Sequence, residues 1–441
     1  KGLQVNTAGT VTIEPYGNNF SSPMTYPITD FVISSNVTGL TIGKDIGSTA
    51  HTDTVTIGGT TSINGPINVY AGNIYLGAGL SSTGLNSSIS LYATTNINTT
   101  ATGLTVQTAG GPILFNSNVT GAGGSIDLDR MTVLSGGGNI TMGGGLNGTD
   151  YAVGTATSSV TGLLGQTKYK GVFFNGVTLN AGGGNISVKG KGWQGSNQND
   201  LVSDFYAIGV DFVGYNAGTT LTTIGNGTIT VDGVGGINYD GTTHSAGINF
   251  YNDANTGVAG HNISTVNGAI NISGTAGTGT ARLRAGIVID YGSFNIYSTT
   301  GAVNIAGYGS SPAVGVMNNG GTMNFGSNGV TTTSGTVTFS ADSLSFALGT
   351  TNVRGTGSLV LKPATTGATI GVGTGSGTLS LGNSWFSGTS VFKDGFSAIV
   401  LGATDAGDIT VGGTNSFVDS VSMVTGGNIT LNSGATITDS Q

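Results

Sequence analysis

The sequence lacks several things that whole classes of protein require. It contains no cysteine, so no disulfide framework holds the fold, and thiol chemistry gives no indication of the compartment. Charged residues are only 7% of the 441 positions, and the 12 Lys and Arg are spread thinly in a chain of net charge −8. Because a phosphate-binding surface needs a basic stripe, we expect no nucleic-acid partner. No uninterrupted apolar stretch approaches the roughly 20 residues of a membrane span, so we expect no membrane insertion.

Long-chain helix formers are also scarce, and Glu14 is the single glutamate. The chain consists instead of Gly, at 82 residues, with Thr, Ser, Asn, Val and Ile, which favour strands and tight corners. We therefore expect little or no α-helix. Apolar residues recur at period two throughout, a pattern that disordered chains lack.

A short sequence motif repeats through the middle of the chain. A Gly-[Val/Ile]-x-[Phe/Ile/Met] element begins at five glycines that stand 38, 38, 39 and 29 residues apart, namely Gly171, Gly209, Gly247, Gly286 and Gly315. Between them lies an alternating element led by Gly184, Gly227, Gly268 and Gly301. One period thus holds two segments of about 19 residues, each near the length of one coil of a solenoid.

The alternation predicts which side chains are buried. In the segment 227–233, Ile229 and Val231 point to one face and Thr228 and Thr230 to the other. Parallel stacking of such strands would place aliphatic residues over one another inside, and stacked Asn residues could form amide ladders between coils. The predicted fold is an all-β, right-handed parallel β-helix of about 20 coils and on the order of 100 Å long.

The regularity of the period divides the chain into three parts. Residues 1–165 are predicted as irregular coils with a Pro-containing loop, 166–326 as regular modules of about 38 residues, and 327–441 as the restart of a longer repeat. Four strand motifs near the start recur near the end in the same order, at offsets of 348, 359, 354 and 355 residues. This superrepeat predicts a piece of a longer polypeptide or assembly that continues beyond both ends.

These residues resemble a known family, the giant β-helical adhesins of the filamentous-haemagglutinin type that Gram-negative bacteria export by two-partner secretion. The resemblance rests on the Gly-x-Ile-x-Ile coil strands, on Gly-Val-x-Phe, and on residues 395–402 leading into 407–411. It implies a right-handed β-helix shaft, surface display, and a role in adhesion or biofilm formation. The Asn-Pro-Asn element of that family's secretion domain is missing from the sequence.

Three stretches depart from the coil pattern, at 15–33, 190–205 and 385–396, and each is predicted to bulge from the shaft as a loop. Because loops on a rigid scaffold carry function more often than its coils, the candidate ligand-binding residues are Trp193, Gln194, Asp200 and Trp385.

The residues give little support for an enzymatic function. Polysaccharide-cleaving β-helices need two or three converging carboxylates, and the closest same-face pair is Asp127 and Asp129, which we expect to lie on a solvated strand. His51, His244 and His261 have no metal-ligand spacing and are expected at the surface or in turns. We therefore predict no enzyme, no cofactor and no metal site.

The predicted function is that of a structural fibre or adhesin shaft, secreted or displayed on a bacterial surface. Its expected partners are further copies stacked end to end, or the continuation of a longer chain, with host or matrix glycans as candidate ligands. The alternative is a protein that binds or cleaves polysaccharide, which would produce new reducing or unsaturated ends.

Overall fold

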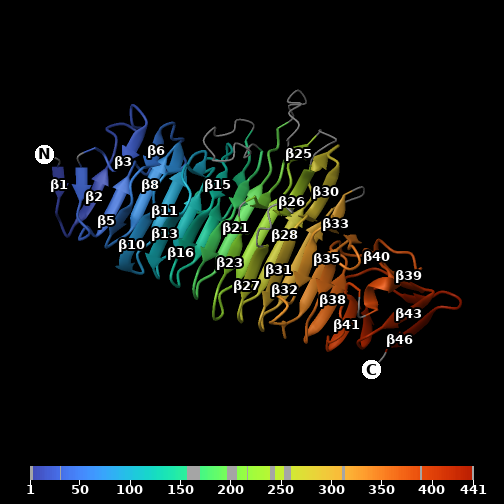
Figure 1. Cartoon of the computed structure of the whole chain (residues 1–441). Helices are drawn as coiled ribbons and strands as arrows, with labels where there is room; N and C mark the ends of the chain where they lie inside the picture. Colours follow the sequence, from blue (N-terminus) through green and yellow to red (C-terminus); the bar gives the residue numbers. More distant parts are fainter. Residues whose placement is uncertain are drawn as a thin grey trace.

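The strands of the computed structural model wind into an elongated parallel β-helix, with the two chain ends at opposite ends of the shaft (Figure 1). The structure describes residues 3–29, 31–155, 169–195, 206–215, 217–238, 244–252, 260–309, 313–387 and 390–439. In these ranges the only helix is a short 3-10 turn, η1 (Asn383–Phe386). The prediction of an all-β solenoid is confirmed.

Among the described residues, no helix has the length and apolar character needed to cross a membrane.

Most coils contribute one strand to each of three long sheets, so strands one coil apart pair in parallel. Sheet 1 comprises β2 (Thr10–Ile13), β5 (Gly39–Ile42), β8 (Ile67–Ala71), β11 (Ile89–Ala93), β14 (Ile113–Asn116), β17 (Ile140–Gly143), β21 (Ile186–Lys191), β24 (Ile229–Val234), β28 (Ile270–Thr275), β32 (Val303–Tyr308), β35 (Val337–Ala341), β38 (Ser358–Lys362), β41 (Ala398–Gly402) and β44 (Val421–Val424), with β18 (Ala152–Val153) paired to β21. Sheet 2 comprises β3 (Met24–Tyr26), β6 (Thr54–Ile57), β9 (Asn73–Leu76), β12 (Ile97–Thr99), β15 (Ile126–Asp129), β19 (Val172–Asn175), β22 (Val210–Gly214), β26 (His244–Asn252), β30 (Leu283–Asp290), β33 (Val314–Asn318) and β36 (Leu344–Ser345). Sheet 3 comprises β7 (Thr61–Ile63), β10 (Leu80–Leu85), β13 (Leu104–Ala109), β16 (Met131–Leu134), β20 (Thr178–Asn180), β23 (Thr220–Thr222), β27 (His261–Thr265), β31 (Ser293–Ser298), β34 (Thr322–Phe325) and β37 (Thr351–Val353).

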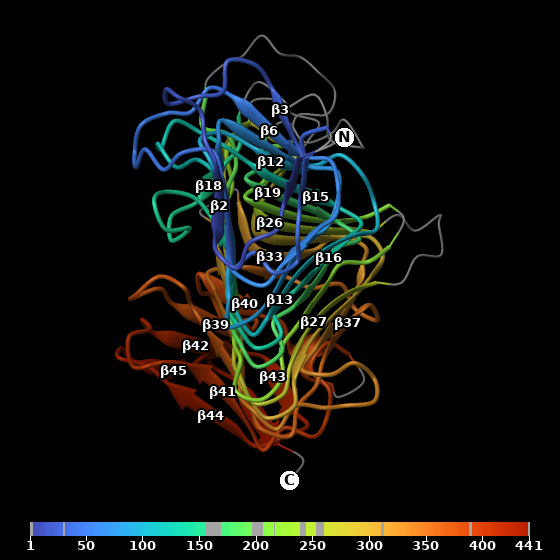
Figure 2. The same cartoon turned by 90° about the vertical axis from the view of Figure 1, so that its left-hand side faces the viewer.

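The arrangement changes near the C-terminal end, where a shorter sheet takes over. Sheet 4 comprises β39 (Ile370–Gly373), β40 (Leu379–Leu381), β42 (Ile409–Gly412) and β45 (Ile429–Leu431). Three pairs of short strands complete the fold: β1 (Leu3–Val5) with β4 (Phe31–Ile33), β25 (Ile237–Asn238) with β29 (Thr278–Gly279), and β43 (Thr414–Phe417) with β46 (Thr436–Asp439). Viewed from the N-terminal end, successive coils stack behind one another (Figure 2).

The coils are longer and fewer than predicted. The strands led by Gly171, Gly209 and Gly247 pair in sheet 2, whereas those led by Gly184 and Gly227 pair in sheet 1. One period of about 38 residues is therefore a single coil, with its third strand in sheet 3. Sheet 1 has fifteen strands, of which β18 lies off the main path, so fourteen coils cross it rather than about 20. At roughly 4.8 Å per coil, the sheet is on the order of 60 Å long rather than 100 Å.

The core is a set of aliphatic columns that run along the shaft axis. In sheet 1, the first inward position is occupied in strict register by one apolar residue per coil, and all but the first and last are buried. This column consists of Val11, Leu40, Ile67, Ile89, Ile113, Ile140, Ile186, Ile229, Ile270, Val303, Val337, Leu359, Ile399 and Val421. Continuous apolar burial of this kind is the main stabilising term of a solenoid.

The repeated glycines have a packing cause. Where sheet 1 meets sheet 2, a Cβ atom on Gly233 would lie 2.1 Å from the carbonyl oxygen of Gly247, and one on Gly274 would lie 2.1 Å from that of Gly286. The same contact recurs one coil earlier and one coil later. Since no side chain fits this close approach of two backbones, these four coils need a glycine there.

Two other predicted features are present. Asn324 donates its side-chain amide to Asn295 at 2.9 Å and accepts from Asn352 at 3.2 Å, which confirms an amide ladder across three coils. Motifs of the superrepeat also pair in the same way: β2 pairs with β5 as β38 pairs with β41, all in sheet 1, and β6 pairs with β9 in sheet 2 as β42 pairs with β45 in sheet 4. Sheet 1 passes through both predicted domain boundaries, and the three-part division stays a prediction.

Candidate functional site

The first predicted ligand-binding stretch follows β21. The Trp193 ring is partly buried and packs on Tyr169 at a centroid distance of 5.3 Å. Gln194 donates its side-chain amide to the carbonyl oxygens of Gly192 and Gly235, at 2.7 and 3.4 Å. Asp200 lies outside the described residues. Both described side chains thus contact neighbouring protein groups, and their role in ligand binding stays a prediction.

Trp385 lies on η1, which follows β40, whereas Trp193 follows β21, so the structure does not bring the two together. Its ring packs against Phe346 and Phe392 at centroid distances of 5.6 and 6.3 Å. The prediction that 385–396 bulges outward was wrong, because Phe386 and Phe392 are fully buried in the main core. The aromatic residues that made this stretch look irregular fill the shaft interior where sheet 2 ends.

The stretch 15–33 was likewise more regular than predicted, since it contains β3 of sheet 2 and β4.

The Asp127 and Asp129 pair is buried rather than solvated, with each residue 2% exposed. The guanidinium of Arg130 donates to both oxygens of Asp129 at 3.0 Å, and Asn175 donates to one of them at 2.7 Å. Asp129 is therefore neutralised by a bidentate partner, as a structural ion pair requires.

A concave site does exist on the outer face of sheet 2, over β19 to β30. This Lys170 pocket encloses about 170 Å³. It is lined by Lys170, Tyr206, Asp211, Val213, Tyr215, His244, Asn249, Tyr251 and Asp290. No pattern in the sequence singled these residues out, because they come from four successive coils and only the register of sheet 2 aligns them.

The centre of the Lys170 pocket is a buried ion pair. Lys170 Nζ lies 2.6 Å from Asp211 Oδ2, with side-chain exposures of 6% and 2%. Asn249 donates to the other carboxylate oxygen at 2.8 Å, and the ammonium lies 4.5 Å from the ring centre of Phe173. The two charges neutralise each other, and the carboxylate also accepts the hydrogen bond of Asn249.

His244 and Asp290 form the second half of the pocket. Their closest atoms, Nδ1 and Oδ2, are 3.8 Å apart, which is too far for a hydrogen bond. Burial lowers the pKa of His244, and the nearby Asp290 carboxylate opposes that shift. His244 is thus a neutral base near pH 7 in a polar cavity.

All three histidines are buried, contrary to the prediction of surface or turn positions: His51 is 8%, His244 4% and His261 1% exposed. His261 lies in the shaft interior against Phe212, Phe250 and Phe294, which the sequence pattern does not reveal. Within the described ranges, no group of three or more His, Asp or Glu side chains could hold a metal ion.

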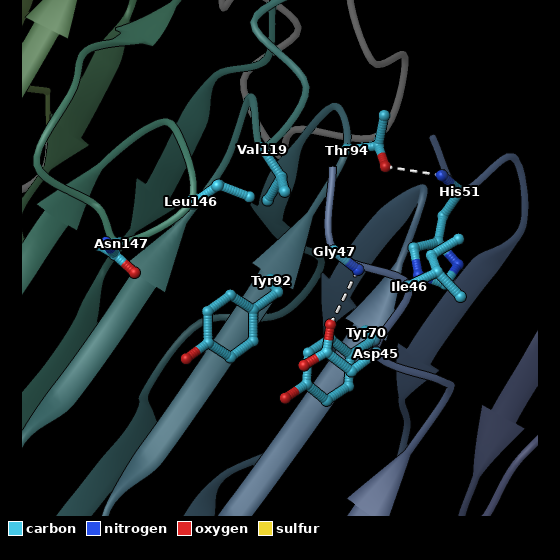
Figure 3. Close-up of a pocket in the computed structure, with 10 residues that line it drawn as sticks. All are labelled: Asp45, Ile46, Gly47, His51, Tyr70, Tyr92, Thr94, Val119, Leu146 and Asn147. Atoms are coloured by element: carbon cyan, nitrogen blue, oxygen red, sulfur yellow. Dashed lines mark hydrogen bonds between the residues drawn. The ribbon is translucent and has the colours of Figure 1, made fainter. Parts of the chain in front are cut away.

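The second concave site lies on the outer face of sheet 1, over β8 and β11. There Tyr70 and Tyr92 stack in register, with ring centroids 4.9 Å apart and ring planes at 6° (Figure 3). We call this site the tyrosine slot. In the sequence, the slot could have been recognised only by two tyrosines that stand 22 residues apart at the same outward position of consecutive strands.

No family model, curated protein or solved structure matches the chain.

Proposed function

We propose that this chain is a shaft segment of a secreted or surface-displayed bacterial adhesin or fibre, of the filamentous-haemagglutinin kind that its coil motifs resemble. The observation that carries the proposal is the unbroken fourteen-strand path of sheet 1, with one apolar residue per coil in a single column. A rod built in this way gives reach and stiffness, because main-chain hydrogen bonds run along its length.

The contacts of the buried carboxylates support the same proposal. The Asp129 and Asp211 carboxylates each lie against a cation and an amide donor, so neither is poised as an acid or base for glycoside cleavage. In the described residues no trio of His, Asp or Glu offers a metal-assisted alternative.

Longitudinal continuation is the second part of the proposal. Ile429 and Leu431 of β45, which lie in register with the buried Ile409 and Val411, are 46% and 54% exposed. The superrepeat places equivalent strand pairs near both ends of the shaft. We propose that a further coil, from the same polypeptide or from another copy, covers this apolar end.

The test uses the purified chain. X-ray scattering and electron microscopy should show rods or filaments, and beads coated with the chain should adhere to cells or to a polysaccharide matrix more than albumin-coated beads do. Compact particles, or coated beads that adhere no better than the albumin control, would contradict the proposal.

The alternative function is binding with cleavage of polysaccharide, for which the Lys170 pocket would be the site. Incubation with plant and bacterial polysaccharides would then generate new reducing or unsaturated ends, and Asp211→Asn would abolish them. We expect unchanged polysaccharide from both proteins.

A further inference from the structure

The tyrosine slot is a cavity of about 250 Å³ on the flank of the shaft. It is lined by Asp45, Ile46, Gly47, His51, Tyr70, Tyr92, Thr94, Val119, Leu146 and Asn147 (Figure 3). Aromatic, aliphatic and polar groups are therefore mixed in one concavity, as in the binding sites of small organic ligands.

The two tyrosines form a flat aromatic strip. They are direct register partners on β8 and β11, their rings are nearly parallel, and both are half-buried. Figure 3 shows their hydroxyl groups pointing the same way along the sheet. Because each ring of the offset stack covers part of the other, the strip offers the uncovered part of its carbon surface for contact and a row of hydroxyls at one edge.

Two loops wall the slot, and both are fixed by hydrogen bonds. In the first, Asp45 accepts from the N–H of Gly47 at 2.9 Å, and the N–H of His51 donates to Thr94 Oγ1 at 2.8 Å (Figure 3). In the second, which carries Leu146 and Asn147, the side chain of Asn116 donates to the carbonyl of Gly145 at 2.7 Å. Walls held in this way reduce the ordering cost of binding.

Polar groups around the strip are available to a ligand. The Nδ1 atom of His51 has no hydrogen-bond partner among the described residues, but it is buried and lies 3.7 Å from Asp53 Oδ1, so it does not face the ligand space. The Asp45 side chain is solvent-exposed, and within the described part of the chain its one hydrogen bond is from the Gly47 N–H to Oδ1. Burial, with Asp45 and Tyr92 nearby, raises the pKa of Tyr70 to about 12, so its hydroxyl is both donor and acceptor at neutral pH.

The charge of Asp45 and the geometry of the two rings argue against some classes of ligand. A phosphate-bearing ligand would meet the Asp45 carboxylate in a chain of net charge −8. A quaternary ammonium group is recognised by rings that surround it, whereas these two rings are parallel and stacked on each other. A pyranose ring presents flat C–H faces to aromatic carbon and hydroxyls to carboxylate and amide groups, such as those of Asp45 and Asn147.

We propose that the tyrosine slot binds one pyranose unit of a neutral oligosaccharide or polysaccharide. The volume, just below the roughly 300 to 1,000 Å³ of sites for drug-sized ligands, suits a single sugar residue of a longer chain. This inference deepens the proposed adhesive role, on which it rests, by naming a ligand class and its residues.

The experiment measures binding of the whole chain to trimers of β-1,4-linked glucose, β-1,4-linked N-acetylglucosamine and β-1,3-linked galactose by titration calorimetry. Tetramethylammonium and adenosine monophosphate are the probes for the two other ligand classes. We expect binding of at least one trimer, weakened tenfold or more by Tyr92→Ala. The matched control Tyr75→Ala, on the neighbouring strand β9 of the same coil, should bind as the unmodified chain does.

Asp45→Asn, in an exposed loop, tests the slot without disturbing the core and should also weaken binding. The inference is overturned if no trimer binds, if tetramethylammonium or adenosine monophosphate binds instead, or if Tyr92→Ala and Asp45→Asn leave trimer binding unchanged. X-ray scattering on the same samples separates the two proposals: rods without sugar binding overturn the slot alone, and compact particles overturn the shaft.

Discussion

The imidazole Nδ1 of His261 accepts a hydrogen bond from the backbone N–H of Thr219, 3.0 Å away. Its Nε2 lies 2.9 Å from the carbonyl oxygen of Tyr251, to which it donates. Since Nδ1 is an acceptor, the single ring proton sits on Nε2 and the histidine is neutral. Phe250 and Phe294 surround the ring and keep water from it.

This geometry predicts acid destabilisation. Burial lowers the pKa of His261 to about 4, against the opposing effects of the Tyr251 carbonyl and the Asp211 carboxylate. Between about pH 6.5 and pH 4 the unfolded chain takes up a proton that the folded chain does not, so stability falls as the pH falls, by about 3 kcal/mol in total. Urea midpoints at pH 7.5, 5.5 and 4.5 measure the loss. His261→Gln, which keeps a donor and an acceptor, should flatten the pH dependence, and an equal slope in both proteins would refute the assignment.

The close contact between glycines of sheets 1 and 2 predicts that two glycine-to-alanine variants differ in stability. Gly233→Ala places a methyl group 2.1 Å from the Gly247 carbonyl oxygen, which is backbone and has no room to move. We expect a loss of at least about 1 to 3 kcal/mol, as for other overpacked sites. Gly183→Ala is the matched control, because a Cβ atom there meets nothing within 4 Å. Denaturant midpoints compare the two, and equal midpoints would show that the close approach is not limiting.

The fold could be predicted from the sequence because its signals are local. Alternating Ile229 and Val231 after a glycine is enough to identify a strand with one buried face, and both side chains are buried. The coil length could not be predicted, because it depends on which strands pair across the helix. Some third strands, such as β23 with its three residues, are short and carry no glycine signal.

The candidate sites were largely beyond sequence reasoning for the same reason. Trp193 and Trp385 stood out as rare residues in irregular stretches, yet each packs on other aromatic rings. Tyr70 and Tyr92 are ordinary outward strand residues, and only the register of neighbouring coils stacks them. The residues of a site on a solenoid come from different coils and are far apart in the sequence, whereas sequence patterns are recognised within one continuous stretch.

The amide ladder predicts a third effect. Asn324 both donates to Asn295 and accepts from Asn352, so Asn324→Ala removes two hydrogen bonds and leaves its neighbours unpaired on one side. We expect a loss of about 1 to 3 kcal/mol, reduced by the partial exposure of the ladder. Thr322→Ala, at an exposed position of the same strand, should change stability by less than about 0.5 kcal/mol. Matching losses in both variants would mean that the ladder contributes nothing of its own.

The buried ion pair predicts non-additive mutations. Lys170→Met leaves the Asp211 carboxylate buried with only the Asn249 amide, and Asp211→Asn leaves the Lys170 ammonium buried, so each should cost about 3 to 5 kcal/mol. The double variant removes both charges and should be more stable than either single variant, because no unpaired charge remains. Lys189→Met, which removes an exposed ammonium, is the control and should cost less than about 0.5 kcal/mol. Denaturant titrations of the unmodified chain, the two single variants and the double variant give the free energies of unfolding for this double-mutant cycle. Purely additive losses would mean that Lys170 and Asp211 stabilise the pocket through separate contacts, and the description of a mutually neutralised pair would then fail.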